Sequence, residues 1–372
     1  MRWEPRRIGD LCMVGRGSSP RPINDQRFFE NGDIPWVKVA DATASGKYLY
    51  ETKLCVNKYG ASYSRLLPAG SLIICTSGTL GLPIILGVDG CIHDGWLYTN
   101  NYKGLDPEFF YYFLQTQRDY FASVAYGAAI QNINTEILRS TEIRLPPESE
   151  QARIAMILKS YDDLIENNRR RMALLEESAR LLYREWFVRL RFPGYEHTPI
   201  VDGVPQGWER KTLGNSVTLN YGKALKAEVR IEGSYPVYGS SGIVGTHEKP
   251  LVQGPAIILG RKGNVGSVYW SSKSFYPIDT VYFVTPEFSS LYLFYALKNM
   301  HFISTDVAVP GLNRNFAYSR LLLHPPVMLL HSFHETVVPL HEQLDKLDEQ
   351  NQKLRAARDL LLPRLMSGDL AV

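Results

Sequence analysis

Apolar residues recur at alternating spacings of three and four in two long stretches, the pattern of a helix that packs along one seam. The first stretch places on its seam Leu158, Ile165, Asn168, Met172, Leu175 and Leu182, and the second places there Leu340, Leu347, Asn351, Leu354 and Leu361. Each pattern lasts for several heptads, which favours a coiled coil over ordinary amphipathic core helices. Because a globular segment separates the two stretches, we expect them to pair antiparallel within the chain and to act as a spacer.

Polar residues, a run of arginines and two prolines modify this helical pattern. Asn168 and Asn351 stand on the seams, where a polar residue lowers stability but fixes register. Pro339 suits the start of the second helix, and Pro363 is expected to end or kink it. The run Arg169-Arg170-Arg171 is suited to contact with DNA phosphates. A charged run on a helix is more often a solvated face, however, and this is the interpretation that we favour.

The two segments that precede these helices are α/β in pattern and repeat the same features in the same order. Each begins at a tryptophan and passes through a glycine loop, an Asp-led strand, a proline-led helix start, an Asn-rich turn and a Pro-Pro break. In the first half these are Trp3, Gly78-Thr-Leu-Gly81, Asp94, Asp106-Pro107, Gln131-Asn-Ile-Asn134 and Pro146-Pro147. In the second half they are Trp208, Gly263-Asn-Val-Gly266, Asp279, Thr285-Pro286, Asn313-Arg-Asn315 and Pro325-Pro326. This order predicts a duplicated α/β unit.

The composition is that of a globular protein, with 45% hydrophobic and 21% charged residues. The formal net charge of +3 permits a nucleic-acid partner without arguing for one, because binding depends on local clusters of charge. Four cysteines without a CxxC pair indicate reduced core residues rather than a disulfide framework or a zinc site. Neither a signal-peptide pattern nor an apolar run long enough to cross a bilayer is present, so we expect a cytoplasmic protein with no membrane association.

Four segments resemble one known family, the specificity subunits of type I restriction–modification systems. They are residues 145–158 (LPPESEQARIAMIL), residues 176–187 (EESARLLYREWF), residues 204–208 (VPQGW) and residues 361–370 (LLPRLMSGDL). The likeness extends over nearly the whole chain. One departure is that the second junction, residues 325–334, lacks the Glu-Gln-Ala-Arg-Ile pattern of the first. Strict symmetry of partner docking is therefore not implied.

The resemblance implies an α/β (α+β) fold with two tandem target-recognition domains and an antiparallel coiled coil. The domains are expected at residues 1–146 and 193–326, each reading one part of a split, asymmetric sequence in double-stranded DNA. The helices at residues 147–192 and 327–372 are expected to set the gap and to dock two methyltransferase subunits, which restriction–translocase subunits can join. No catalytic, metal or cofactor site is expected in this chain, and S-adenosylmethionine, ATP and Mg²⁺ are expected only in the partners.

The residues that read DNA must combine phosphate anchors with side chains that reach base edges. The strongest local candidates lie in the second glycine loop, where Arg261, Lys262 and Asn264 can donate, and the matching first loop offers Thr76, Ser77 and Thr79. The alternative is a plain turn with solvent-facing charge.

The Asn-rich turns come next, because Asn suits adenine and Arg suits guanine in the major groove. Their candidates are Asn132, Asn134, Asn313, Arg314 and Asn315. The alternative is that each Asn forms the backbone bonds of its own turn. The weaker candidates are Arg21, Trp36, Lys38, Lys223, Ser240 and Ser241.

The sequence lacks three motifs that are typical of enzymes. No Asn/Asp-Pro-Pro-aromatic tetrapeptide for base methylation and no GxxxxGK[ST] phosphate loop occurs, and His334-Glu335 lacks the second histidine of a zinc-protease helix. The competing hypotheses are a nuclease or methyltransferase with similar recognition domains, and a scaffold whose globular parts bind protein. Loss of binding at high salt favours DNA over a largely apolar protein interface.

Overall fold

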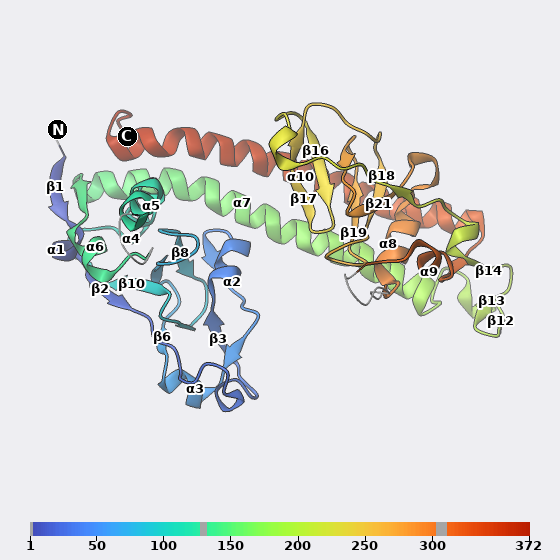
Figure 1. Ribbon diagram of the computed structural model, residues 1–372, viewed down its shortest axis with the longest axis horizontal. Coiled ribbons are helices and arrows are strands. Elements are labelled where there is room, and N and C mark those ends of the chain that lie inside the picture. Colours follow the sequence, from blue (N-terminus) through green and yellow to red (C-terminus); the bar gives the residue numbers. More distant parts are fainter. Residues whose placement is uncertain (1–2, 127–131, 303–310) are drawn as a thin grey trace. The chain divides into compact units, whose positions relative to one another are not determined.

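The computed structural model describes residues 3–126, 132–302 and 311–372 (Figure 1). Gln131, assigned by its sequence to an Asn-rich turn, lies outside the described residues. Contacts divide the chain into two units, Met1–Arg169 with Glu349–Val372, and Arg170–Asp348. Each unit therefore combines one globular part with a portion of both long helices, whereas the sequence boundaries separated globular parts from helices.

The first unit is built on two mixed sheets. The larger sheet has the strand order β2 (Met13–Arg16), β10 (Trp96–Asn100), β7 (Leu72–Cys75), β8 (Pro83–Leu86) and β4 (Tyr48–Leu49). The second sheet has the order β5 (Cys55–Val56), β3 (Ile34–Val37), β9 (Gly90–Ile92) and β6 (Arg65–Leu67). Strand β1 (Glu4–Arg7) pairs antiparallel with β11 (Glu142–Leu145). The helical segments are α1 (Ile8–Leu11), η1 (Gln26–Phe28), α2 (Val39–Ala44), α3 (Lys58–Ser62), α4 (Pro107–Thr116), α5 (Arg118–Tyr126) and α6 (Thr135–Ser140).

The second unit repeats this plan with fewer strands. Its larger sheet has the order β15 (Asn220–Tyr221), β21 (Val281–Val284), β18 (Ala256–Gly260) and β19 (Val268–Ser271). Its smaller sheet has the order β17 (Gly242–His247), β16 (Tyr235–Gly239) and β20 (Tyr276–Pro277). Strand β14 (Glu209–Thr212) pairs with β22 (Leu321–His324), and β12 (Ile200–Val201) pairs with β13 (Val204–Pro205). The short helical segments are η3 (Tyr195–His197), η4 (Leu213–Asn215), η5 (Ala227–Val229), η6 (Pro286–Phe288), α8 (Leu291–Asn299) and α9 (Arg314–Tyr318).

Strand pairing shows that the two globular parts are copies of one α/β unit. In the first unit β10 lies between β2 and β7 with antiparallel pairing, and in the second β21 lies between β15 and β18 in the same way. The parallel pair β3–β9 corresponds to the parallel pair β16–β20. The fold class and the internal repeat predicted from the sequence are therefore confirmed.

Two long helices follow the globular parts, α7 (Glu148–Tyr183), continued by a π-helical turn η2 (Arg184–Val188), and α10 (Val327–Ser367). In the first unit, Asn168 donates to Asn351 at 3.0 Å and Arg358 donates to Asp162. Residue 168 of α7 contacts residue 351 of α10, and the earlier residue 162 contacts the later residue 358. The two helices therefore run antiparallel, as predicted. The seam residues are buried at Leu158, Ile165, Asn168, Leu347 and Asn351, and half-buried at Met172, Leu175, Leu182, Leu340, Leu354 and Leu361.

The second helix neither starts at Pro339 nor ends at Pro363, because both prolines lie inside α10. The helix begins directly after the Pro-Pro break, where the Pro326 carbonyl accepts N–H bonds from Leu329 and Leu330 at 3.0 and 3.2 Å. The helix continues beyond Pro363, and Leu365 is 1% exposed in the hydrophobic core of the first unit. Burial of this last turn favours continued helix despite the backbone hydrogen bonds that proline removes.

The Asn168–Asn351 pair gives a prediction about stability. Replacing Asn351 by Leu leaves the buried Asn168 amide without this acceptor, which we expect to lower the free energy of unfolding by about 1–3 kcal/mol. The double variant Asn168→Leu/Asn351→Leu replaces both polar groups and should recover most of that loss. Urea denaturation of the three proteins checks this. A double variant less stable than Asn351→Leu would contradict it.

A second prediction concerns pH and the core of the second unit. His341 on α10 shares a hydrogen bond of 2.8 Å with the Tyr295 hydroxyl on α8, and burial lowers the pKa of His341 to about 4. The unfolded chain therefore binds a proton near pH 6.5 that the folded chain takes up only near pH 4. Stability contributed by neutral His341 is present above pH 6.5 and is lost as the pH falls to 4, by up to about 3 kcal/mol.

Urea denaturation at pH 7, 5.5 and 4.5 measures this loss, with His341→Gln as the comparison because it removes the titrating ring. The variant should lose less stability over the interval than the parent chain does. Equal pH dependence in the two proteins would show that His341 does not contribute.

Candidate nucleic-acid interface

The two glycine loops have the same turn geometry. In the first, the Gly81 N–H donates to the Cys75 carbonyl at 2.9 Å, and in the second, the Gly266 N–H donates to the Gly260 carbonyl at 3.0 Å. The glycines Gly78, Gly81, Gly263 and Gly266 all have φ between +71° and +79°. This left-handed backbone strongly favours glycine over other residues. Each loop thus extends from an interior strand of its sheet, β7 or β18, in the way that the repeat predicts.

The second unit gathers two arginines around one exposed tyrosine. The guanidinium carbons of Arg261 and Arg314 both lie 5.0 Å from the centroid of the Tyr221 ring. Arg261 is further held by a 3.0 Å bond from Nη1 to the Asp279 carbonyl. The Tyr221 side chain is 48% exposed. Two oriented guanidinium groups beside an open aromatic face form a surface suited to phosphate contact, guanine contact or base stacking.

Other candidates from the sequence surround this arginine pair. The backbones of Arg261 and Lys262 both donate to Thr280, and the Asn264 N–H donates to the Ser240 hydroxyl at 3.4 Å. The Lys223 N–H donates to the Pro277 carbonyl at 3.0 Å. The exposed members of this set are Lys223, Ser241, Lys262 and Asn264, and Ser240 is half-buried. The loop, β15 and the α9 start are therefore brought together.

The side chains of two of the candidate asparagines cap helices. The side-chain oxygen Oδ1 of Asn134 accepts the Ile137 N–H at 2.8 Å and caps α6. The side-chain oxygen Oδ1 of Asn313 accepts N–H bonds from Asn315 and Phe316 at 2.8 and 3.2 Å and caps α9. The turn-forming alternative therefore accounts for both. Asn315 is exposed, and the Asn132 side-chain oxygen is buried without a hydrogen-bond partner.

In the first unit a carboxylate organises the candidate surface. Asp94 accepts hydrogen bonds from the Arg21 guanidinium at 2.8 Å and the Ser19 hydroxyl at 2.7 Å. Burial works to raise the pKa of Asp94, but these two donors, the Asp94 backbone N–H and His93 together outweigh it, and the pKa lies below its ordinary value. The Arg21 side chain remains 71% exposed. Asp94 thus positions a cation that stays open to solvent.

Two candidates in the first unit do not reach the surface. The Trp36 side chain is 1% exposed and packs between Phe29 and His93, and Thr76 is 0% exposed. Neither can touch a base in this structure, so both are removed from the candidate interface. Lys38 is half-buried, with Nζ 5.1 Å from the Trp36 ring centroid, and Ser77 and Thr79 are half-buried in the glycine loop.

Tyr221 and Asp94 are functional candidates that sequence reasoning missed. Asp94 opens one of the repeated features, and its counterpart Asp279 holds Arg261 through the backbone, so the repeat contained a signal. Tyr221 carried no signal of its own, because the pairing of β15 with β21 brings it to Arg261 and Arg314. Over the described ranges, no group of three metal-ligating side chains is present. Nor does any helix in those ranges have the length and apolar character to cross a membrane.

Comparison with known proteins gives consistent results. A family model described as the type I restriction modification DNA specificity domain matches residues 1–177 and 205–316. The chain is 24% identical to the type I restriction enzyme MjaIX specificity subunit of Methanocaldococcus jannaschii, covering 100% of this chain and 94% of that one. It is 22% identical to the EcoprrI specificity subunit of Escherichia coli, covering 83% and 80%.

Among solved structures, the S subunit of a type I restriction–modification system from M. genitalium has a similar fold. The TM-score is 0.58 at 20% identity, and the match covers 98% of this chain and 96% of that one.

Proposed function

The chain belongs to the type I restriction modification DNA specificity family, and from this membership we propose that it recognises a bipartite, asymmetric DNA target and directs partner subunits to it. Members of the family are DNA-recognition components rather than catalysts. Each globular part reads one half of the target, and the two halves differ because the recognition residues of the two parts differ. The antiparallel helices set the length of the unread gap.

The observation that carries this proposal is the cluster of Arg261, Arg314 and Tyr221. It presents two guanidinium groups and an exposed ring from one side of the second unit, next to the exposed Lys262. Phosphate anchoring and guanine reading both use arginine in this way. In the first unit Arg21, held by Asp94, is the corresponding exposed cation.

The proposed partners are two methyltransferase subunits that dock on α7 and α10, with restriction–translocase subunits joining them. In this proposal S-adenosylmethionine, ATP and Mg²⁺ are bound by those partners. The first helical junction carries Glu-Gln-Ala-Arg-Ile and the second does not, so the two docking surfaces differ in sequence.

Methylome sequencing tests the proposal directly. Cells that express the partner methyltransferase are compared with and without this chain. We expect a split methylated motif only when both are present, which also identifies the target. Methylation by the partner alone, unchanged by this chain, would refute the specificity function and favour a scaffold.

A further inference from the structure

Arg16 on β2 lies in the first unit where Tyr221 on β15 lies in the second. Counted from the tryptophans at which the two repeats begin, the two residues have the same position. Each pairs with the third residue after the repeated aspartate, which is Asp94 in the first unit and Asp279 in the second. A glycine follows each of them, and a Cβ added to either glycine would stand 2.1 Å from the carbonyl oxygen of the residue before that aspartate. The repeat thus makes Arg16 the counterpart of Tyr221.

An arginine donates to the backbone carbonyl of the repeated aspartate in both units. In the second unit, Nη1 of Arg261 donates to the Asp279 carbonyl at 3.0 Å. In the first unit, Nε of Arg16 donates to the Asp94 carbonyl at 2.8 Å. The loop position of Arg261 is occupied in the first unit by Thr76, whose side chain is buried. The arginine at this carbonyl therefore comes from the glycine loop in one unit and from β2 in the other.

Two guanidinium groups meet at Asp94, as two meet at Tyr221 in the second unit. The Asp94 carboxylate accepts hydrogen bonds from Ser19 on one oxygen and Arg21 on the other, and it therefore offsets the charge of Arg21. Arg16 is exposed, and within the described ranges its Nη1 and Nη2 atoms donate to no group of the chain. Arg16 thus presents its charge and the outer edge of its guanidinium fork to solvent.

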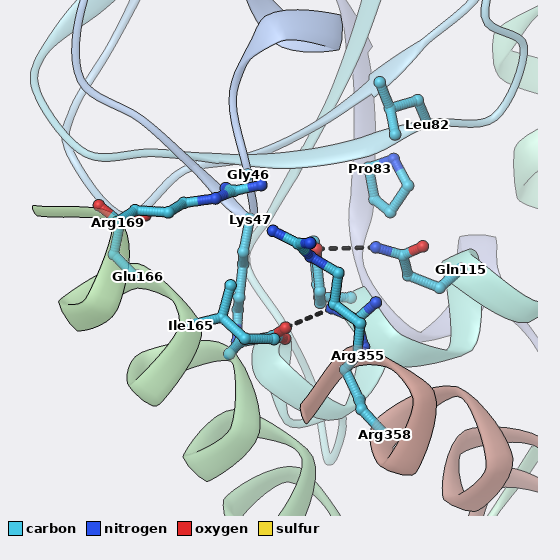
Figure 2. Close-up of a pocket in the computed structure, with 12 residues that line it drawn as sticks. Gly46, Lys47, Leu82, Pro83, Gln115, Ile165, Glu166, Arg169, Arg355 and Arg358 are labelled. Atoms are coloured by element: carbon cyan, nitrogen blue, oxygen red, sulfur yellow. Dashed lines mark hydrogen bonds and ion pairs between the residues drawn. The ribbon is translucent and has the colours of Figure 1, made fainter. Parts of the chain in front are cut away.

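Other arginines of the first unit gather between its helices, where acids lie beside them. Figure 2 shows Arg169, Arg355 and Arg358 on the two long helices, around a cavity of about 180 Å³. Asp162 and Glu166 line the same cavity, and Arg358 donates to Asp162. Arg355 also has a partner within the chain. Contacts inside the protein therefore account for Arg355 and Arg358, in contrast to the surface around Asp94.

We propose that Arg16 is a DNA-contacting residue of the first unit, where it supplies the guanidinium that Arg261 supplies in the second. This role rests on the proposed function and adds to it a residue outside the predicted sites. The bond from Arg16 to Asp94 is exposed, and an exposed hydrogen bond contributes little to stability because water can replace it. An arginine brought to the same carbonyl by different elements therefore points to a ligand rather than to packing. The ligand groups that match the guanidinium fork are phosphate oxygens and the O6 and N7 edge of guanine.

Fluorescence anisotropy of the full chain with duplex of its methylated motif tests the role of Arg16. Arg16→Gln is expected to weaken binding about tenfold, because one well-placed arginine contact is lost. Arg6→Gln is the control and should bind as the parent chain does, because Arg6 is an exposed arginine of the same unit on the separate strand pair β1–β11. Arg16→Tyr, which introduces the residue that the second unit has at this position, serves if the glutamine variant does not fold.

Two further measurements distinguish a backbone phosphate from a guanine as the group that Arg16 contacts. If Arg16 contacts a phosphate, Arg16→Gln lowers the slope of log K against log salt by about 1 and weakens binding to all duplexes alike. If Arg16 reads guanine, the slope is retained, and Arg16→Gln causes no further loss on a duplex in which that guanine is replaced. Arg16→Lys keeps the charge without the fork, so it preserves a phosphate contact better than a guanine contact.

Unchanged affinity of Arg16→Gln for a duplex that the parent chain binds would overturn the role of Arg16 and leave the proposed function intact. An equal loss in Arg6→Gln would also overturn it, because any exposed positive charge of the unit would then have the same effect. A parent chain that binds no duplex would refute the proposed function itself, and the role of Arg16 with it.

Discussion

Replacing Arg261 and Arg314 together by alanine is expected to weaken binding of the target duplex by about 100-fold or more. Each well-placed arginine contact with DNA contributes about 1–3 kcal/mol, and tenfold in affinity corresponds to about 1.4 kcal/mol. Both guanidinium groups lie over Tyr221, so the two substitutions remove the centre of the cluster. Fluorescence anisotropy with the motif found by methylome sequencing measures the effect.

Lys249→Ala is the matched control, since this lysine belongs to the same unit and its side chain is 80% exposed. It should change affinity little. The salt dependence then separates two roles of the arginines. If both contact phosphates, the slope of log K against log salt falls by about 2, and if they read guanine, selectivity relaxes while the slope is retained. Unchanged affinity of the double variant would remove the cluster from the interface.

Asp162→Ala is expected to lower the free energy of unfolding by about 3 kcal/mol. Asp162 is 5% exposed and accepts bonds from both the Tyr112 hydroxyl and Arg358. Its removal leaves a half-buried guanidinium and a buried hydroxyl without this acceptor, and breaking one side of a buried ion pair costs several kcal/mol. Thermal and urea denaturation measure the loss.

The neighbouring residue supplies the control for this prediction. Asp163 pairs with Lys159 one turn earlier on α7, but both side chains are largely in solvent, at 50% and 39% exposed. Asp163→Ala should therefore cost well under about 1 kcal/mol. Similar losses in the two variants would show that the Tyr112–Asp162–Arg358 contacts do not hold α7, α10 and α4 together.

The helical seams and the internal repeat could be predicted because each depends on residue spacing and motif order, which the sequence shows without any tertiary contact. The spacing of Leu158, Ile165 and Asn168 is visible without knowing what they face. The pairing partner of Asn168 could not be predicted, because only the register of α10 against α7 places Asn351 opposite it. The helix start was wrongly assigned to Pro339. The preference of proline for a first helical turn is a local property, whereas α10 is stabilised by packing along its length.

The candidate site was predictable in part for the same reason. Arg261 and Arg314 could be selected by residue type and loop position, but Tyr221 reaches them only through strand pairing. Trp36 and Thr76 were selected by position in the repeat and are buried. The residues that cover them come from distant parts of the sequence: His93, which directly follows β9, packs against Trp36 on β3. A single sequence does not reveal which face of such a strand is covered.

The pairing of the first and last strands of each globular part has a consequence for the inheritance of this protein. β1 lies against β11, and β14 lies against β22, so the chain enters and leaves each globular part at adjoining strands. A recombination that exchanges residues 8–141 or 213–320 for a foreign segment with the same ends preserves both seams. Under the proposed function, each part is an exchangeable cassette, and such an exchange would replace one half of the DNA target in one genetic step while the paired helices stay the same.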